Sequence, residues 1–207
     1  MAGAGQCMAD ELRRVAFVLW PGTHPASVMP ALAVLRSANR MAESELYRAE
    51  CYTLDDQPLV SPEGWHLPAR PWPGEGVDNA VIWLVADGIA QPASIPPGLA
   101  AQCRNLVREG LPVGAIEGGV YPLAMSGLLD GHRCAVHWRM IDDFRERFPA
   151  VTAGSELFAQ DRGRLSSSGG QATLDLFLGL LAEERDADLA AMVAEELVVE
   201  RLRDGGE

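Results

Sequence analysis

The sequence lacks a long apolar run. No segment approaches the ~18 uninterrupted apolar residues that are typical of a membrane-spanning helix, and residues 1–14 contain no apolar stretch long enough for a signal peptide. These absences argue against a membrane-spanning protein and a secreted one. We therefore expect a cytoplasmic protein with no membrane partner.

Basic residues are scarce. The chain carries 17 lysines and arginines against 29 acidic residues, a formal net charge of -12. Such a surface repels phosphate backbones, so this domain is not expected to bind nucleic acid itself. DNA contact would have to come from another part of the parent protein. The simpler interpretation is that the charge only keeps a soluble protein from aggregating.

Metal-binding patterns are also missing. The four cysteines, Cys7, Cys51, Cys103 and Cys134, form no CxxC pair and no Cys/His cluster with zinc spacing. We expect reduced, structural thiols, no metal and no cofactor. There are no internal repeats and no low-complexity linker.

The sequence does contain a regular alternation of predicted strands and predicted helices. Its 207 residues are 48% hydrophobic, which suits one domain with a sizeable core. Apolar runs bounded by turn residues predict strands at 15–20, 47–54, 80–86, 112–116 and 133–136. Helical spacing predicts helices at 25–41, 97–109, 120–126, 139–148, 171–184 and 188–199, and hairpins are expected within 59–67 and 157–166.

This order predicts an α/β fold with a mostly parallel sheet and helices on both faces. Sites in such folds lie at the carboxyl ends of the strands. The turns after Trp20, Ala86, Ile116 and Val136 are therefore expected to converge on one crevice.

A sharp turn, Glu117-Gly118-Gly119, joins the strand at 112–116 to the helix at 120–126. It is followed by LAMSGLLDG at 123–131 and AVHW at 135–138. These segments resemble the nucleophile elbow, the "LA-x-x-GLLDG" helix and the "THW" motif of amidotransferase-like (ThiJ/PfpI) domains in AraC-family regulators. Residues 18–22, 35–40, 46–55, 144–149 and 167–176 resemble the family in the same order, so the resemblance runs from about 14 to 199.

The resemblance implies a flavodoxin-like three-layer sandwich of the class I glutamine amidotransferase-like type, forming a homodimer. It also implies a domain division. Residues 1–13 would be an N-terminal extension, 14–200 the ligand-sensing domain, and 201–207 the start of a linker to a C-terminal helix-turn-helix domain.

The chain departs from the enzymatic members of that family. They carry a cysteine at the elbow and a glutamate on the first helix, whereas the expected positions here hold Glu117 and Ala33. We therefore expect no catalytic residue and no enzyme. The alternative is a ThiJ/PfpI-type hydrolase or hydratase in which Glu117 attacks the substrate and His137 acts as acid or base.

Glu117 is expected to face a ligand, although a glutamate on a loop more often points to solvent. The small residues Gly118 and Gly119 allow the tight turn that directs it into the crevice. Gly88 would present a backbone amide to the elbow. Asp87 would be a turn cap or a second acid in the pocket.

Aromatic residues are expected around this carboxylate. Trp20 and Trp138 would wall the crevice with His137, and His24 would lie at its mouth, although tryptophans at strand ends often serve packing alone. A carboxylate between aromatic faces favours an organic cation. A carboxylate on that ligand is expected to meet amides at the start of the helix after Glu117.

Three functions remain open. The first is a non-catalytic sensing and dimerisation domain that binds a small-molecule effector, an amine or quaternary ammonium metabolite. It agrees with the resemblance, because AraC-type relatives sense amino acids and quaternary amines such as arginine or betaines. The others are the hydrolase or hydratase and a structural dimerisation module. If Glu117 is protonated or bonded to His137, the pocket would take a neutral ligand.

Overall fold

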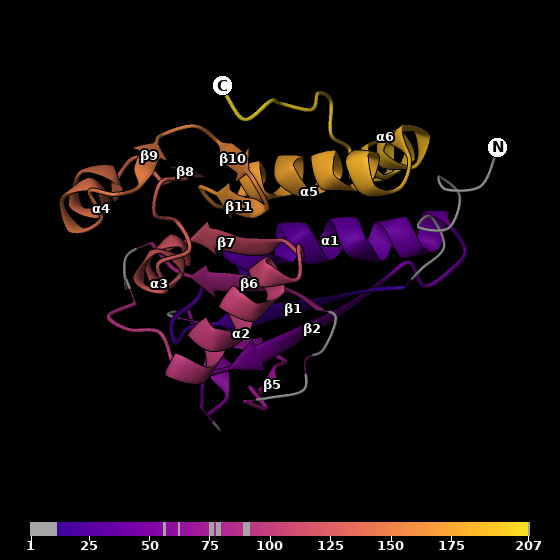
Figure 1. Cartoon of the computed structure of the whole chain (residues 1–207). Coiled ribbons are helices and arrows are strands. Elements are labelled where there is room, and N and C mark those ends of the chain that lie inside the picture. The colour runs from indigo at the N-terminus through magenta and orange to yellow at the C-terminus, as the bar shows by residue number, and fades with distance from the viewer. Residues whose placement is uncertain are drawn as a thin grey trace.

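A computed structural model describes residues 12–55, 57–61, 63–74, 77, 80–88 and 92–206 (Figure 1). Cys7 and nearly all of the extension expected at residues 1–13 lie outside these residues; the first strand begins at Arg13. Within the described residues, no helix combines the length and apolar character needed to cross a bilayer.

A seven-stranded sheet with the order β10-β11-β7-β6-β1-β2-β5 forms the centre of the molecule. All neighbouring pairs are parallel except β10 and β11, which form an antiparallel hairpin at one edge. Two small sheets, β3-β4 and β8-β9, lie beside it. The strands are β1 (Arg13–Leu19), β2 (Tyr47–Thr53), β3 (Leu59–Val60), β4 (His66–Leu67), β5 (Arg70–Pro71), β6 (Ala80–Ala86), β7 (Val113–Glu117), β8 (Arg133–Ala135), β9 (Thr152–Gly154), β10 (Phe158–Asp161) and β11 (Arg164–Ser167).

Helices cover both faces of this sheet, which gives a three-layer α/β sandwich (Figure 1). One layer contains α1, α5 and α6, and the opposite side holds α2, α3 and α4. The helices are α1 (Pro25–Met41), α2 (Pro97–Arg108), α3 (Val120–Met125), α4 (Ile141–Arg147), α5 (Gln171–Glu184) and α6 (Ala187–Glu196). The fold class predicted from the sequence is confirmed.

Alternation along the strands builds two cores. In β1, Phe17 and Leu19 face the layer of α1 and α5, while Val18 faces the other layer. The α1 side is closed by aromatic packing, with the rings of Trp83 and Phe177 centred 4.6 Å apart. A strand buried on both faces reads as a continuous apolar run, which is why β1 and β6 are so evident in the sequence.

Several helix boundaries differ from the predicted ones by one to three residues. Four helices end earlier than predicted, at Arg108, Met125, Arg147 and Glu196, and two begin at other residues. The helix expected at 139–148 begins at Ile141, because Met140 closes a turn by donating to the carbonyl of His137 at 2.8 Å. The last helix begins at Ala187, where Asp186 accepts hydrogen bonds from two backbone amides of its first turn.

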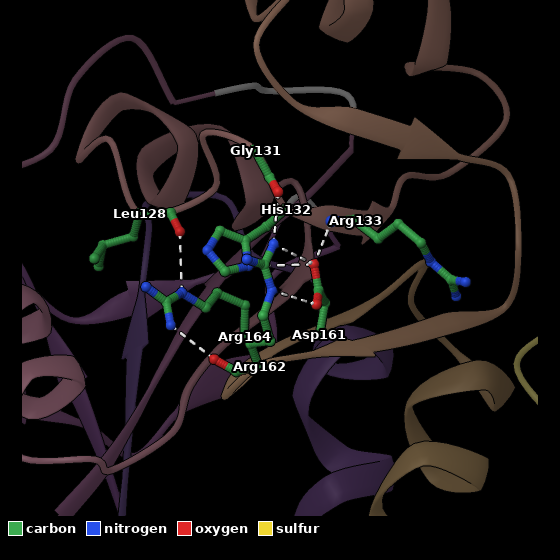
Figure 2. Close-up of polar contacts among 7 residues, drawn as sticks. All are labelled: Leu128, Gly131, His132, Arg133, Asp161, Arg162 and Arg164. Atoms are coloured by element: carbon green, nitrogen blue, oxygen red, sulfur yellow. Dashed lines mark hydrogen bonds and ion pairs between the residues drawn. The ribbon is translucent and has the colours of Figure 1, made fainter.

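The tip of the β10–β11 hairpin is tied to the loop before β8 by a polar network (Figure 2). Asp161 accepts hydrogen bonds from the amide of Arg133 at 2.8 Å and from Arg162 Nε at 3.0 Å. Arg162 also donates to the carbonyl of Gly131 at 2.6 Å. His132 Nδ1 lies 3.2 Å from Asp161 Oδ2, within ion-pair range but without the alignment of a hydrogen bond.

Asp161→Asn is expected to reduce stability at pH 7, and its effect should become steadily smaller as the pH falls below ~3.9. The Arg162 guanidinium, followed by the Arg133 amide, holds the pKa of Asp161 well below its usual range. A carboxyl with a depressed pKa contributes stability fully above its unfolded value of ~3.9, and this is lost as pH falls through the folded value. Urea unfolding across this range measures the effect. The control Asp142→Asn removes an exposed carboxylate of α4, and its effect on the free energy of unfolding should not depend on pH in this way. If the effect of both variants depends on pH in the same way, the proposed role of Asp161 is wrong.

Candidate ligand-binding site

The carboxyl ends of two central strands bring the predicted site together. Ala86 at the end of β6 is paired in register with Glu117 at the end of β7. Asp87 and Gly88 therefore follow β6 directly beside the elbow. Parallel strands place their loops at one edge of the sheet, which is why residues thirty positions apart meet here.

Glu117 has the strained backbone that the elbow motif predicts. Its φ is +54°, a left-handed conformation that glutamate rarely adopts. The amide of Gly118 donates to the Ala86 carbonyl at 2.9 Å, and that of Gly119 donates to the Ile116 carbonyl at 3.0 Å. These bonds hold the turn, and they also correct one expectation. Both amides already have acceptors, so they do not offer a site for a ligand carboxylate.

Two donors hold the carboxylate of Glu117. Ser27 Oγ donates to Oε2 at 2.6 Å, and the Gly88 amide donates to Oε1 at 3.3 Å. The first-helix position that faces the elbow is thus Ser27, and not Ala33 as the family resemblance implied. Ala33 lies six residues further along α1, ~9 Å along the helix axis.

A cavity of about 510 Å³ opens beside this carboxylate. An adjoining cavity of about 280 Å³ shares Asp87, Glu117, His137 and Trp138 with it, and Gly88 lines this second space. The larger cavity is lined by His24, Ala26, Ser27, Asp87, Glu117, His137, Trp138, Ser155, Leu157, Ser168, Gly169, Gly170, Gln171, Ala172 and Arg203.

His137 lines the cavity but is not bonded to the elbow. Its Nδ1 accepts from the amide of Arg139 at 3.2 Å, so a neutral ring would carry its proton on Nε2. Within the described part of the chain, no hydrogen bond joins His137 to Glu117. The geometry does not form the His/Glu pair considered for catalysis.

The two-tryptophan wall is not formed. Trp20 is only 7% exposed, packs in the core with Ala16 and Val18, and lines neither cavity. Trp138 does line both and is 65% exposed, but the Arg139 guanidinium already lies over its ring, 5.1 Å from the centroid. Charge, more than an aromatic box, therefore dominates this site.

Three contributions were missed by the sequence analysis. Ser27 gave no signal beyond its place near the start of α1. The loop after β11 approaches the elbow so closely that a Cβ on Gly169 would lie 3.0 Å from Glu117 Oε2; the sequence identified this segment as a family motif without assigning it to the site. Arg203, from the segment expected to be a linker, lines the cavity. Among the described residues, no cluster of His, Cys, Asp or Glu suits a metal ion.

Known proteins that resemble this chain in sequence are transcriptional regulators. No family model matches it. The HTH-type transcriptional regulator ArgR of Pseudomonas aeruginosa is 44% identical over 200 residues, which cover 97% of the chain and 60% of ArgR. The HTH-type transcriptional regulator CdhR of the same organism is 34% identical over 187 residues, covering 90% of the chain and 55% of CdhR.

Solved structures agree with these relatives. An AraC family transcriptional regulator from Pseudomonas putida superposes with a TM-score of 0.79 at 27% identity, covering 89% of the chain and 99% of that structure. The chain has the fold of ThiJ/PfpI proteins, and its relatives are HTH-type transcriptional regulators. A ThiJ/PfpI family protein from Pseudomonas syringae has the same fold, with a TM-score of 0.69 at 20% identity over 97% of the chain and 82% of that protein. The chain spans little more than half the length of the two relatives ArgR and CdhR.

Proposed function

We propose that this ThiJ/PfpI-like domain is the non-catalytic effector sensor of an AraC-family regulator and that its effector is a small amine or quaternary ammonium metabolite. The observation that carries the proposal is the Glu117 carboxylate, which Ser27 and Gly88 hold on the wall of the 510 Å³ cavity. DNA binding would belong to a helix-turn-helix domain following residue 207, within the part of the relatives that this chain does not cover.

Charge supports a cationic effector. Glu117 and Asp87 line the cavity from adjacent strand ends, and the arginine on the same wall, Arg203, is paired with the buried Asp175. Two opposite unit charges 4 Å apart at an effective dielectric constant of about 20 attract each other by about 4 kcal/mol, against about 0.5–2 kcal/mol for an aromatic face. With Trp20 in the core, recognition of a cation would rest on the carboxylates.

The arrangement of Glu117 argues against the hydrolase or hydratase. Its two oxygens accept hydrogen bonds from Ser27 and Gly88, and no acid or base among the described residues is bonded to them. A carboxylate nucleophile needs such a partner to move protons during turnover. The names of the relatives, which are transcription regulators, point the same way.

We expect the domain to form a homodimer, as the family resemblance implies. Ligand binding to this dimer would change how the two DNA-binding regions are oriented. A ligand achieves this only through different affinities for two states of the dimer. The acidic surface of this domain keeps it off the DNA itself.

Glu117→Gln is expected to abolish stabilisation by cationic metabolites. At a hundredfold excess over Kd, a ligand stabilises the native state by about 2.7 kcal/mol, which raises the melting temperature of a domain of this size by about 5–10 °C. Thermal unfolding with L-arginine and glycine betaine measures this shift. Glu117→Gln keeps the shape and the acceptor for Ser27 but loses the charge.

Glu109→Gln, at the exposed end of α2, is the matched control for loss of one negative charge and should keep the full shift. Stabilisation by anionic or neutral metabolites, with no effect of cations, would exclude the proposed effector class. Turnover of an amide or isocyanide substrate that is lost in Glu117→Gln would instead support the enzyme.

A further inference from the structure

The chain turns back on itself after α6. The amide of Val198 donates to the carbonyl of Glu195 at 3.0 Å, and that of Val199 donates to the carbonyl of Ala194 at 2.9 Å, which together form a Schellman motif. Val198 has a φ of +56°, a left-handed conformation that β-branched residues rarely adopt. Such strain persists where the surrounding structure requires it. Here it begins the path that carries the chain back across α5 toward β10 (Figure 1).

An ion pair anchors the returning segment, residues 201–206, to α5. Arg203 Nε and Nη2 both donate to Asp175 Oδ2, at 2.8 and 2.5 Å. The Asp175 side chain is fully buried, and that of Arg203 is 30% exposed. Among the described residues, Arg203 is the only cation paired with this carboxylate. A buried carboxylate that loses its partner is costly, so the pair opposes release of the segment.

The backbone provides a second anchor two residues later. The amide of Leu157 donates to the carbonyl of Gly205 at 2.9 Å. A Cβ on Gly205 would lie 2.4 Å from the carbonyl oxygen of Phe158, so the segment lies directly against the start of β10. The φ of Gly205 is outside the left-handed region, so contact alone excludes a larger residue there.

The two anchors decide where the chain leaves the domain. Arg203 and Leu157 both line the 510 Å³ cavity, so the last described residues lie beside it and not beyond the end of α6. Two attachments so close together fix the direction of the backbone as well as its position. Chain ends usually fray, because ordering them costs conformational entropy. An end held by a buried ion pair and a backbone hydrogen bond departs from that rule.

We propose that segment 201–206 is a latch that holds the region following residue 207 in a fixed place beside the cavity. A flexible linker would let two domains move independently, whereas the latch makes their arrangement depend on the Arg203–Asp175 pair and the Gly205 contact. ArgR is longer than this chain, which covers 60% of it, and the positioned region would belong to the part that is not covered. The inference rests on the proposed function only for the nature of that region, and it concerns no effector.

Gly205→Ala breaks the latch without changing any charge, because the added methyl group would collide with the Phe158 carbonyl. Gly206→Ala is the matched control. A Cβ there would meet only the carboxylate of Asp204, at 3.3 Å, and that exposed side chain can rotate away. A second latch variant, Asp175→Asn/Arg203→Gln, removes the ion pair and leaves no buried charge unpaired.

Hydrogen exchange of the Leu157 amide measures the latch directly in residues 1–207. The Gly205 carbonyl is its acceptor, so release of the segment should speed exchange about tenfold or more in both latch variants. Gly206→Ala should keep the wild-type rate, and the amides of β7 should keep theirs in every variant. Unchanged exchange at Leu157 in both latch variants would overturn the latch.

Trypsin and small-angle X-ray scattering test the arrangement in the full-length parent regulator. The chain contains no lysine, so trypsin cuts it only after arginine, and the Arg201–Leu202 bond lies at the exposed start of the segment. Wild type and Gly206→Ala should be cut there slowly, and both latch variants about tenfold faster or more, because proteases cleave the released state. Scattering should show a wider spread of distances between the domains in the latch variants.

Wild-type cleavage as fast as that of the latch variants, or an equally wide spread of distances, would overturn the inference and leave the proposed effector sensor intact. Failure of cationic metabolites to stabilise the domain would instead overturn the proposed effector and leave the exchange, cleavage and scattering results unchanged. The two proposals can therefore fail separately.

Discussion

Gly119→Ala is expected to lower the free energy of unfolding by about 3 kcal/mol, because it forces a methyl group into the central sheet. A Cβ at this position would lie 1.9 Å from the carbonyl oxygen of Leu84 and 3.0 Å from that of Ile116. Both carbonyls belong to central strands and cannot retreat without disturbing the ladder. The φ of Gly119 is -60°, a conformation that alanine adopts freely, so the effect isolates the steric contact.

Gly179→Ala is the matched control. Gly179 lies within α5, and a Cβ there would meet nothing within 4 Å. Alanine in a helix interior is more favourable than glycine by ~1 kcal/mol, so this variant should be slightly stabilised. Urea unfolding of both variants at pH 7 gives the comparison. A Gly119→Ala domain as stable as the wild type would mean that the elbow is not packed against β6 as tightly as the structure describes.

The elements predicted best from the sequence are those with the most burial. β6, predicted at 80–86, matches its observed limits, since a strand covered on both faces is a continuous apolar run that ends where polar residues begin. The missed strands are short. β5 is two residues long and β9 is three, and they are strands only because β2 and β8 supply partners. No local pattern carries that information.

The site was predictable as far as sheet topology determines it. Asp87 and Glu117 lie at the ends of the paired strands β6 and β7, so their order in the sequence was enough to bring them together. His137 follows β8, which belongs to the small β8-β9 sheet outside the central sheet, and it lines the same cavity. Ser27 and Arg203 reach the cavity through the position of α1 and the path of the chain after α6, which depend on tertiary packing. Whether these residues bind a ligand remains a prediction.

Trp20 illustrates how a strand-end residue can be misplaced. It continues the alternation of β1 and falls on the same side as Ala16 and Val18, in the core beneath α2. Side chains two residues apart share a face of a strand. Extending the alternation of β1 by one residue therefore places Trp20 on the buried face with Ala16 and Val18. A tryptophan on that face packs against the hydrophobic layer and does not reach the crevice.

Glu117→Cys is expected to react with iodoacetamide at pH 8 at least about a hundredfold faster than Cys103 or Cys134. Burial raises the pKa of both native thiols to about 12. Only about one in ten thousand of such thiols is ionised at pH 8, against about a quarter of thiols with the usual pKa of ~8.5, and only the thiolate reacts. A thiol at the elbow would face the cavity and lie beside the Ser27 and Gly88 donors, which favour its anion.

Tandem mass spectrometry of tryptic peptides would follow each thiol separately, including Cys7, and would locate the label within the peptide 49–104, which carries both Cys51 and Cys103 because trypsin does not cleave before Pro71. Cys51, whose pKa burial raises to about 11, should react about tenfold faster than the two deepest thiols, because it has about ten times more thiolate at pH 8. In 8 M urea all sites should react at similar rates, because unfolding removes the burial that separates their pKa values. If the thiol of Glu117→Cys is as slow as Cys103 in the folded protein, the elbow side chain does not open to the cavity, and the carboxylate of Glu117 cannot be the group that receives a cationic effector.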